Sequence, residues 1–374
     1  MFCALLLMLK PITMMPSIHF WGKETMKLTH TQALMQSMAQ NQQLDSWAVW
    51  VGKSGKEQLI MSENVNEDTY FDVASMGKIL VTTPLILKLV GENRIRLTDT
   101  LGVFFPNAPQ DKRDLTVRQL LTHSSGIIRV PIPEEIGLQG HDAVADHILA
   151  SKIAFLPDEK VVYSCNGYIL LGFIVEKMYG MTLDQAFYQY LANPLGLERA
   201  RFNIDIHEEN AAVCYTRKEV GKFRADDDNV CHMQGVAGSG AQFFSVGAIR
   251  KFIQAVMEKD ERLYPKNLFA QAEMNWTSQF SDEGRGLGYL VTTDTYQQTQ
   301  KLFPVGSFGH TGYTGMSMFM NREEDMFAII LTNATRFANM KSGFRGFNYV
   351  ESIEKMREAV NNEIYRDLVE QNLI

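Results

Sequence analysis

A serine and a lysine stand three positions apart in the tetrapeptide SMGK, residues 75–78. A serine hydroxyl is a weak nucleophile, and it needs a neighbouring base before it can attack a carbonyl group. If Ser75 opens a helix, Lys78 lies one turn later on the same face. Burial that lowers the pKa of Lys78 would then let it serve as the base. The alternative is that Ser75 is only the N-cap of that helix.

The same spacing occurs again at Ser352 and Lys355, inside an amphipathic segment near the C-terminus. We interpret this second pair as part of a solvent-exposed helix face. Ser75 differs because the long apolar run ILVTTPLILKLV follows it, and the lysine of a merely solvated face would not lie there. The context therefore favours the first pair as the one that does chemistry.

Tyr163 lies in a second candidate stretch, VVYSCNGYIL, residues 161–170. A buried phenol needs a hydrogen-bond partner, so the simpler interpretation is a packed tyrosine with a satisfied hydroxyl. The functional interpretation is a general acid–base whose pKa is lowered by a nearby ammonium. Two residues later, Cys165 is a nucleophile, a packing residue or a substitute for another residue type.

The third candidate stretch is FGHTG, residues 308–312, just before a pair of strand-like segments. The glycines on both sides of His310 and Thr311 let a backbone or a substrate approach closely. His310 could be a turn histidine, or it could donate a hydrogen bond to a substrate carboxylate or to the Tyr163 phenol.

Several other polar residues have simpler interpretations. We expect His123, in LTHSSG, to be a structural, hydrogen-bonded histidine. The acidic run 226–228 (Asp226, Asp227 and Asp228) fits no calcium-loop spacing, and we expect a solvated turn there. We expect Cys214 and Cys231 to be buried small hydrophobic residues, and we predict no metal site.

Hydrophobic spacing indicates the elements that must position these motifs. We expect helices over 29–43, 76–90, 166–180 and 352–370. We expect strands over 46–51, 57–61, 286–291, 315–321 and 326–333. Pro84 should kink the second helix or begin a new first turn. Thr116 with Gln119, and Thr182 with Gln185, have the spacing of capping boxes.

Strands at both ends of the chain and helices between them predict an α/β (α+β) fold. We expect one antiparallel sheet flanked by helices, with a mostly helical region inserted. Residues 26–374 would form a single catalytic unit, and residues 1–25 a non-core extension. The sheet region would cover about 26–85 and 285–374, and the helical region about 86–284.

Composition narrows the class of protein. The 374 residues are 45% hydrophobic and 21% charged, with a formal net charge of −7 and no basic run, which argues against nucleic acid as a partner. The four cysteines have no CxxC spacing, and reduced thiols favour a cytoplasmic protein. The apolar stretch 2–9 is too short to span a bilayer. Export is the alternative if residues 1–25 act as a signal.

The order Ser-x-x-Lys, Tyr-Ser-x and His-Thr-Gly resembles the penicillin-recognising serine hydrolases. This superfamily includes class C β-lactamases, D-alanyl-D-alanine carboxypeptidases, D-aminopeptidases and related esterases. FDVASMGK, LTVRQLLTHSSGI, YSCNGYILLGFIVEK, RGLGYLV and GHTGYTGMSMFMN follow the family order, over about residues 30–345. The resemblance implies a sheet domain, an all-helical domain and a site between them.

The resemblance also implies roles for the matching residues. Ser75 would be the acylated nucleophile, Lys78 would help to deprotonate it, and Tyr163 would carry the proton to the leaving group. The strand triplet would be His310, Thr311 and Gly312. The backbone N–H groups of Ser75 and Tyr313 would form the oxyanion hole.

One position departs from the family pattern, because Cys165 stands where the motif commonly has an asparagine that contacts the substrate. We therefore predict a serine hydrolase for small esters, amides or β-lactams, with no cofactor. The alternatives are a D-alanyl peptidase, or a penicillin-binding or sensor-type module with slow or no turnover. A cysteine nucleophile at Cys165 has no family precedent.

Overall fold

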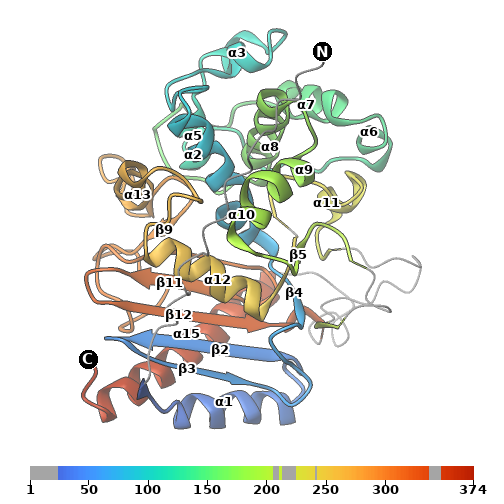
Figure 1. Ribbon diagram of the computed structural model, residues 1–374. Coiled ribbons are helices and arrows are strands. Elements are labelled where there is room, and N and C mark those ends of the chain that lie inside the picture. The colour runs from blue at the N-terminus through green and yellow to red at the C-terminus, as the bar shows by residue number, and fades with distance from the viewer. Residues whose placement is uncertain (1–23, 205–209, 213–224, 241, 337–346) are drawn as a thin grey trace, which may run out of the picture.

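The computed structural model describes residues 24–204, 210–212, 225–240, 242–336 and 347–374. An eight-stranded sheet lies between helices in the lower half of the molecule, and a mostly helical region lies above it (Figure 1). The strand order is β1-β3-β2-β12-β11-β10-β9-β8. The strands are β1 (Glu24–Thr25), β2 (Trp47–Lys53), β3 (Lys56–Met61), β8 (Gly284–Arg285), β9 (Leu290–Val291), β10 (Phe308–Thr311), β11 (Ser317–Asn321) and β12 (Met326–Thr332).

Strands that are far apart in the sequence, β2 and β12, lie side by side in the middle of this sheet. All residues of β2 and β12 are buried, as expected for apolar strands covered on both faces. They pair antiparallel from Trp47–Thr332 to Lys53–Met326. Only the short edge strand β1 runs parallel to its neighbour β3. The predicted α+β class, with an antiparallel sheet and many helices, is confirmed.

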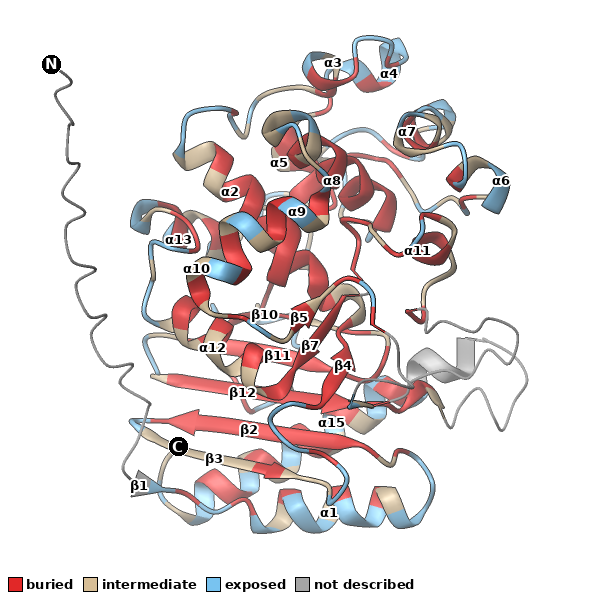
Figure 2. Cartoon of the chain, turned by 45° about the vertical axis from the view of Figure 1, so that its right-hand side comes forward, coloured by how far each residue is buried: buried red, intermediate tan, exposed pale blue. Residues whose placement is uncertain are grey.

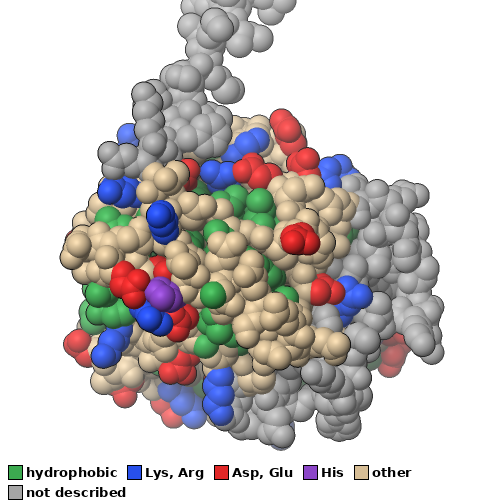
Figure 3. Space-filling view, turned by 90° about the horizontal axis from the view of Figure 1, so that it is seen from below, with side chains coloured by type: hydrophobic (Ala, Val, Ile, Leu, Met, Phe, Trp, Pro, Cys, Tyr) green, Lys and Arg blue, Asp and Glu red, His purple; other side chains and the backbone are tan. Residues whose placement is uncertain are grey.

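Helices α1 (Thr29–Gln40) and α15 (Phe347–Glu370) cover the lower face of the sheet (Figure 1). Asp367 joins them, because its carboxylate accepts hydrogen bonds from the backbone N–H groups of His30 and Thr31, both at 2.9 Å. Seen from below, the described side chains mix acidic, basic and hydrophobic groups (Figure 3).

The opposite face of the sheet carries the helical region. The buried residues concentrate in the strands and in α8, and the exposed ones on outer helices such as α3, α4 and α6 (Figure 2). The helices are α3 (Leu101–Phe104), α4 (Gln110–Arg113), α5 (Val117–Leu121), α6 (Glu134–Gly137), α7 (His141–Ala150), α8 (Cys165–Tyr179), α9 (Leu183–Phe187), η3 (Tyr188–Ala192), α10 (Asn193–Leu195), α11 (Asp228–His232), α12 (Val246–Met257) and α13 (Lys266–Glu273).

The apolar run after Ser75 forms three consecutive helical segments. They are the 3₁₀ turn η1 (Ala74–Met76), the π-helical turn η2 (Lys78–Thr82) and α2 (Thr83–Gly91). Pro84 lies in the first turn of α2, so the predicted new first turn is confirmed. Among the described residues, Ala74–Gly91 is the one stretch apolar and long enough to cross a membrane, and 72% of it is buried inside the protein. It therefore packs as a core helix.

A second, four-stranded sheet has the order β5-β7-β4-β6. Its strands are β5 (Ala200–Arg201), β7 (Phe243–Ser245), β4 (Tyr70–Asp72) and β6 (Ala211–Ala212). β4 runs directly into η1, so this small sheet fixes the direction from which the chain reaches Ser75.

The capping predictions hold at both helices. The Thr116 hydroxyl accepts from the Gln119 N–H at 3.2 Å, and the Gln119 side chain accepts from the Thr116 N–H at 2.9 Å. The Thr182 N–H donates to the Gln185 side chain at 3.2 Å. The expected strand over 286–291 is wrong in its first half. Residues 286–289 form a turn between β8 and β9, closed by the hydrogen bond from the Gly286 N–H to the Tyr289 carbonyl at 2.9 Å.

Residues 1–23 lie outside the described residues. The predicted extension over residues 1–25, and the cytoplasmic location, stay predictions.

Candidate active site

Ser75 contacts both Lys78 and Tyr163, the two residues that the sequence analysis grouped with it. The Tyr163 hydroxyl donates to Ser75 Oγ at 2.6 Å, and Lys78 Nζ donates to the same oxygen at 3.3 Å. Ser75 and Lys78 come from successive turns, η1 and η2, whereas Tyr163 comes from the loop before α8. A serine hydroxyl in contact with both an amine and a phenol is equipped for proton transfer during nucleophilic attack.

The Lys78 side chain is fully buried. Its Nζ also donates to the carbonyl of Ser239 and, at 3.6 Å, to Cys165 Sγ. The same nitrogen lies 4.9 Å from the centroid of the Tyr163 ring. These contacts fix the Lys78 amine in one place. In the second Ser-x-x-Lys pair, by contrast, the side chains of Ser352 and Lys355 are exposed on α15, as predicted.

The Tyr163 ring is 38% exposed, and the residue lines a cavity. Desolvation by the surrounding protein raises the pKa of its phenol well above the usual 10, although the Ser75 hydrogen bond and the Arg285 charge act in the opposite direction. The predicted lowering of this pKa is therefore wrong for the resting protein. Tyr163 is a neutral phenol, and it is a proton donor rather than a standing phenolate.

Cys165 is the first residue of α8, and it is 7% exposed. Its Sγ lies 3.6 Å from Lys78 Nζ and 4.0 Å from the Tyr163 hydroxyl. The thiol thus contacts both Lys78 and Tyr163, and Cys165 also lines the cavity. A thiol is only a weak donor and a weak acceptor, so this wall of the site offers little polar recognition.

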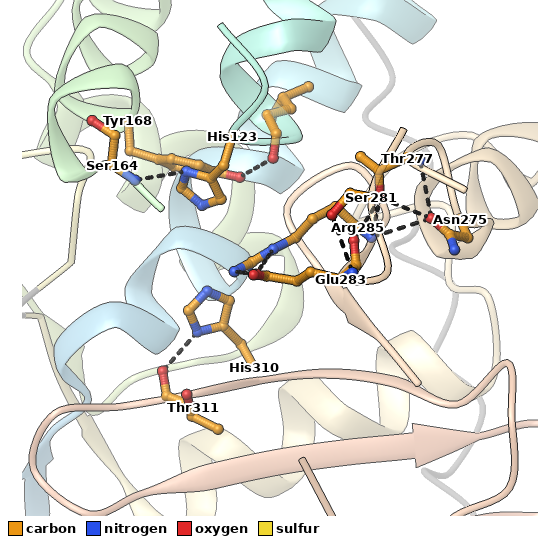
Figure 4. A network of polar contacts seen from close by, with 11 residues as sticks. His123, Ser164, Tyr168, Asn275, Thr277, Ser281, Glu283, Arg285, His310 and Thr311 are labelled. Atoms are coloured by element: carbon orange, nitrogen blue, oxygen red, sulfur yellow. Dashed lines mark hydrogen bonds and ion pairs between the residues drawn. The ribbon is translucent and has the colours of Figure 1, made fainter. Parts of the chain in front are cut away.

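The strand triplet forms the end of β10. The His310 ring is buried, and its Nδ1 donates to the Thr311 carbonyl at 2.7 Å (Figure 4). Burial, together with the charges of Lys78 and Arg285, lowers the His310 pKa well below 6.5. The ring is therefore neutral, and its buried Nε2 presents a lone pair. In this tautomer Nε2 can only accept a hydrogen bond, and the anticipated donation to a carboxylate or to Tyr163 would need the other tautomer.

Sequence reasoning missed Arg285, at the end of β8. Its side chain is buried and forms an ion pair with Glu283, and its guanidinium lies 5.7 Å from the Tyr163 ring centroid. Figure 4 shows this guanidinium beside the rings of His123 and His310. The only signal was its place as the first residue of the family segment RGLGYLV.

His123 is confirmed as a buried, hydrogen-bonded histidine. Its Nδ1 accepts from the Ser164 backbone N–H at 3.1 Å (Figure 4). Burial and nearby positive charge lower its pKa well below 6.5, so the ring is neutral. The centroid of the His123 ring lies 4.6 Å from the centroid of the Tyr163 ring, so the two rings pack against each other.

These side chains open into a cavity of about 720 Å³, a size suited to a small molecule. Ser75, Tyr163, Cys165, His310, Thr311, Gly312 and Tyr313 all line it. The cavity is also lined by residues that the sequence analysis did not assign to the site: Ala74, Arg129, Glu283, Arg285, Leu290, Tyr296, Gln298, Ile353, Glu354 and Arg357. The fold therefore brings together every predicted site residue, and Lys78 alone among them lies beneath the cavity wall, in contact with Ser75 and Cys165.

The acidic run at 226–228 is not the solvated turn that we expected. Asp226 is buried, Asp227 caps α11 by accepting from the Val230 N–H at 3.2 Å, and Asp228 begins α11. All three line the cavity opposite β10.

The remaining cysteines take no part in this site. Cys231 is buried, as predicted, and its Sγ donates to the Ala225 carbonyl at 3.2 Å. Cys214 lies outside the described residues. Within the ranges that the structure describes, no group of three His, Cys, Asp or Glu side chains could hold a metal ion.

The fold and the Ser–Lys–Tyr arrangement are those of a penicillin-recognising serine hydrolase. The family model "Beta-lactamase" matches residues 31–345, and the chain belongs to this family. It is 26% identical over 305 residues to "Putative D-alanyl-D-alanine carboxypeptidase" of Escherichia coli K12, which covers 71% of this chain and 69% of that protein.

Solved structures show the same fold at lower identity. EstCE1, described as a hydrolase with promiscuous acyltransferase activity, superposes with a TM-score of 0.68 at 18% identity, covering 89% of this chain and 97% of EstCE1. A class C beta-lactamase from Rhodobacter sphaeroides superposes with a TM-score of 0.68 at 15% identity, covering 90% of this chain and 99% of that one.

Proposed function

We propose that this protein is a serine hydrolase that forms an acyl-enzyme on Ser75 and hydrolyses small esters or amides. The observation that carries the proposal is the contact of one serine oxygen with the Tyr163 hydroxyl at 2.6 Å and Lys78 Nζ at 3.3 Å. A serine in two such contacts, at the edge of a cavity, is poised to attack a bound carbonyl carbon.

In the acylation step, Ser75 Oγ bonds to the carbonyl carbon and its proton passes to the Lys78–Tyr163 pair. The backbone N–H groups of Ser75 and Tyr313 stabilise the oxyanion. The bond to the leaving group breaks as the phenol of Tyr163 gives that group a proton. The raised pKa of Tyr163 supports this role, because the phenol enters the reaction in its neutral form.

In the deacylation step, a water molecule attacks the acyl ester while Tyr163 and Lys78 accept its proton. The bond from the acyl carbon to Ser75 Oγ breaks, and the proton returns to the serine. The acid product leaves, and the site regains its starting protonation state. No cofactor is needed in either step.

The cavity supports a small polar substrate. Its lining includes the carboxylates of residues 226–228, the guanidinium groups of Arg285 and Arg357, and apolar surface from Leu290 and Tyr296. The names of two similar proteins, a putative D-alanyl-D-alanine carboxypeptidase and a hydrolase with promiscuous acyltransferase activity, support peptides and other acyl compounds as candidate substrates.

A second function is favoured by one observation, the thiol of Cys165 between Lys78 and Tyr163. A site with weak polar recognition of an amide could be acylated by a β-lactam and then turn over slowly or not at all. The protein would then be a penicillin-binding or sensor-type module.

The first test compares Ser75→Ala with Ser352→Ala on a p-nitrophenyl ester, a chromogenic cephalosporin and a D-alanyl peptide. We expect Ser75→Ala to abolish turnover, because no other group supplies the nucleophile. Ser352→Ala removes the exposed serine of the other Ser-x-x-Lys pair, and its activity should equal that of the wild type. Turnover that survives in Ser75→Ala contradicts the proposal.

Mass spectrometry separates the two functions. A β-lactam adduct on Ser75 that persists without product release favours the binding module. Rapid loss of the acyl group, with product formation, favours the hydrolase.

A further inference from the structure

We propose that Asp72 is a positioning residue that holds three segments of the cavity wall in register: the nucleophile turn, the turn after the His-Thr-Gly triplet and the acidic wall. This inference rests on the proposed acyl-enzyme chemistry of Ser75. Asp72 ends β4, three residues before the nucleophile, and it is 1% exposed. It does not line the cavity, so it acts only through other residues.

The first link reaches the nucleophile turn. Asp72 Oδ1 accepts the backbone N–H of Ala74 at 2.9 Å. Ala74 has φ +45°, in the left-handed region that residues with a Cβ rarely adopt. A strained backbone of this kind persists only when its surroundings hold it. The Asp72 carboxylate therefore helps to hold the conformation that presents Ser75.

The second link connects Asp72 to the turn after the His-Thr-Gly triplet. The backbone carbonyl of Asp72 accepts the Thr314 hydroxyl at 3.0 Å. Thr314 is fully buried and directly follows Tyr313, the predicted second donor of the oxyanion hole. The Thr314 carbonyl in turn accepts the hydroxyl of Thr332, on β12, at 2.8 Å. Asp72 thus joins the nucleophile turn to a turn that the main sheet holds in place.

The third link reaches the acidic wall. Asp72 Oδ2 accepts the backbone N–H of Asp226 at 2.8 Å. Asp226 begins the part of the wall that includes Asp227 and the start of α11. One carboxylate therefore uses its two oxygens to fasten two different sides of the cavity.

The charge of this carboxylate has a measurable consequence. Burial raises the Asp72 pKa from 3.8 to about 7, its two backbone donors lower it, and the facing carboxylates of Asp226 and Asp227 raise it. Below about pH 7 Asp72 takes up a proton, and one of its oxygens becomes a poorer acceptor. The pKa values of the two buried site histidines, His123 and His310, lie well below 6.5, so these rings do not cause the protonation step near pH 7.

The test measures kcat/KM against pH, with an activated ester, for Asp72→Asn and for a matched control, Asp367→Asn. Asp367 is also buried and accepts two backbone N–H groups at 2.9 Å, but it joins α1 to α15. We expect Asp72→Asn to lower kcat about 10- to 100-fold, because an amide nitrogen would face one of the two backbone donors and shift the segment behind it. We also expect the wild-type acid limb near pH 7 to disappear in this variant.

Asp367→Asn should lower thermal stability while kcat and the pH profile stay as in the wild type. If Asp72→Asn does not fold, Thr314→Val carries the test, because it removes only the hydroxyl that donates to the Asp72 carbonyl. We expect this variant to lose about 3- to 10-fold in kcat and to keep the acid limb near pH 7.

Wild-type kcat in Asp72→Asn, with the acid limb retained, overturns the inference, and so does wild-type kcat in Thr314→Val. Neither result touches the proposed function if Ser75→Ala is inactive in the same assay. Full activity of Ser75→Ala would instead remove the proposed function itself.

Discussion

At the scale of single residues, Cys165 separates this site from the motif that it resembles. Its Sγ lies 3.6 Å from Lys78 Nζ and lines the cavity. An asparagine there would offer a strong donor and a strong acceptor, whereas a thiol offers neither. Esters need less recognition than amides, because their leaving groups depart without a full proton transfer. We therefore expect this site to prefer esters.

The substitution Cys165→Asn should shift that preference. One added hydrogen bond to an amide substrate is worth about 1 kcal/mol, so the ratio of kcat/KM for an amide to that for the matching ester should rise about fivefold. The ratio is measured with an ester and an amide of the same acyl group.

Cys231→Ser is the matched control for this substitution. Cys231 is also 7% exposed, but its thiol donates to the Ala225 carbonyl and does not line the cavity. An unchanged ratio in Cys165→Asn would show that the thiol does not set the preference.

Sequence reasoning found Ser75, Lys78 and Tyr163 because their spacing and order form a recognisable motif. It missed Asp72 and Arg285, whose importance depends on partners that are distant along the chain, such as Asp226 for Asp72. It also predicted the wrong direction for the Tyr163 pKa, because the desolvation that raises this pKa exists only in the folded protein.

At the scale of elements, the loop before β7 supports the nucleophile turn through a close backbone approach. A Cβ on Gly240, which has φ +132°, would lie 2.2 Å from the Ala74 carbonyl oxygen and 3.2 Å from Ser75 Cα. Only glycine allows the loop to lie this near to the turn that presents Ser75.

We expect Gly240→Ala to lower kcat at least tenfold, because the added methyl group pushes the nucleophile turn out of position. The control is Gly55→Ala, since Gly55 also has a positive φ, +76°, but a Cβ there would meet nothing within 4 Å. Both variants should lose about 1–2 kcal/mol of stability from backbone strain, measured by urea unfolding. Equal kcat values in the two variants would exclude a role for this contact.

The elements were predicted best where local chemistry decides the structure. The capping boxes at Thr116 and Thr182 appear in the structure, because their hydrogen bonds join residues only three apart. The strand expected over 286–291 failed because Gly288, with φ +91°, turns the chain there. A Cβ on Gly288 would lie 2.2 Å from the Thr83 hydroxyl oxygen, and a hydrophobic pattern does not reveal this close approach.

At the scale of the whole molecule, buried tyrosines determine how stability depends on alkaline pH. Tyr168, Tyr264 and Tyr289 are fully buried, and desolvation raises the pKa of each phenol above 10 in the folded state. Above about pH 10 the unfolded chain loses these protons first, so the folded state binds more protons. Stability therefore falls as pH rises above about 10.

Each phenol should remove about 1.4 kcal/mol of unfolding free energy in total between about pH 9 and 11, because the unfolded phenol is half ionised near pH 10. Urea unfolding between about pH 9 and 11 measures this slope. Tyr264→Phe should make the slope shallower, because one of the phenols with a raised pKa is lost. A slope that is the same in this variant would mean that other groups cause the alkaline loss of stability.

The pairing of β2 with β12 also affects how the protein is made. During synthesis β2 leaves the ribosome long before β12, its neighbour in the sheet. Until β12 emerges, one edge of this wholly buried strand lacks its final partner. Such surfaces are prone to aggregate and are typical binding sites for chaperones. The nucleophile turn therefore reaches its supported conformation only after Thr314 and Thr332 have emerged, because the Asp72 carbonyl is linked through them to β12.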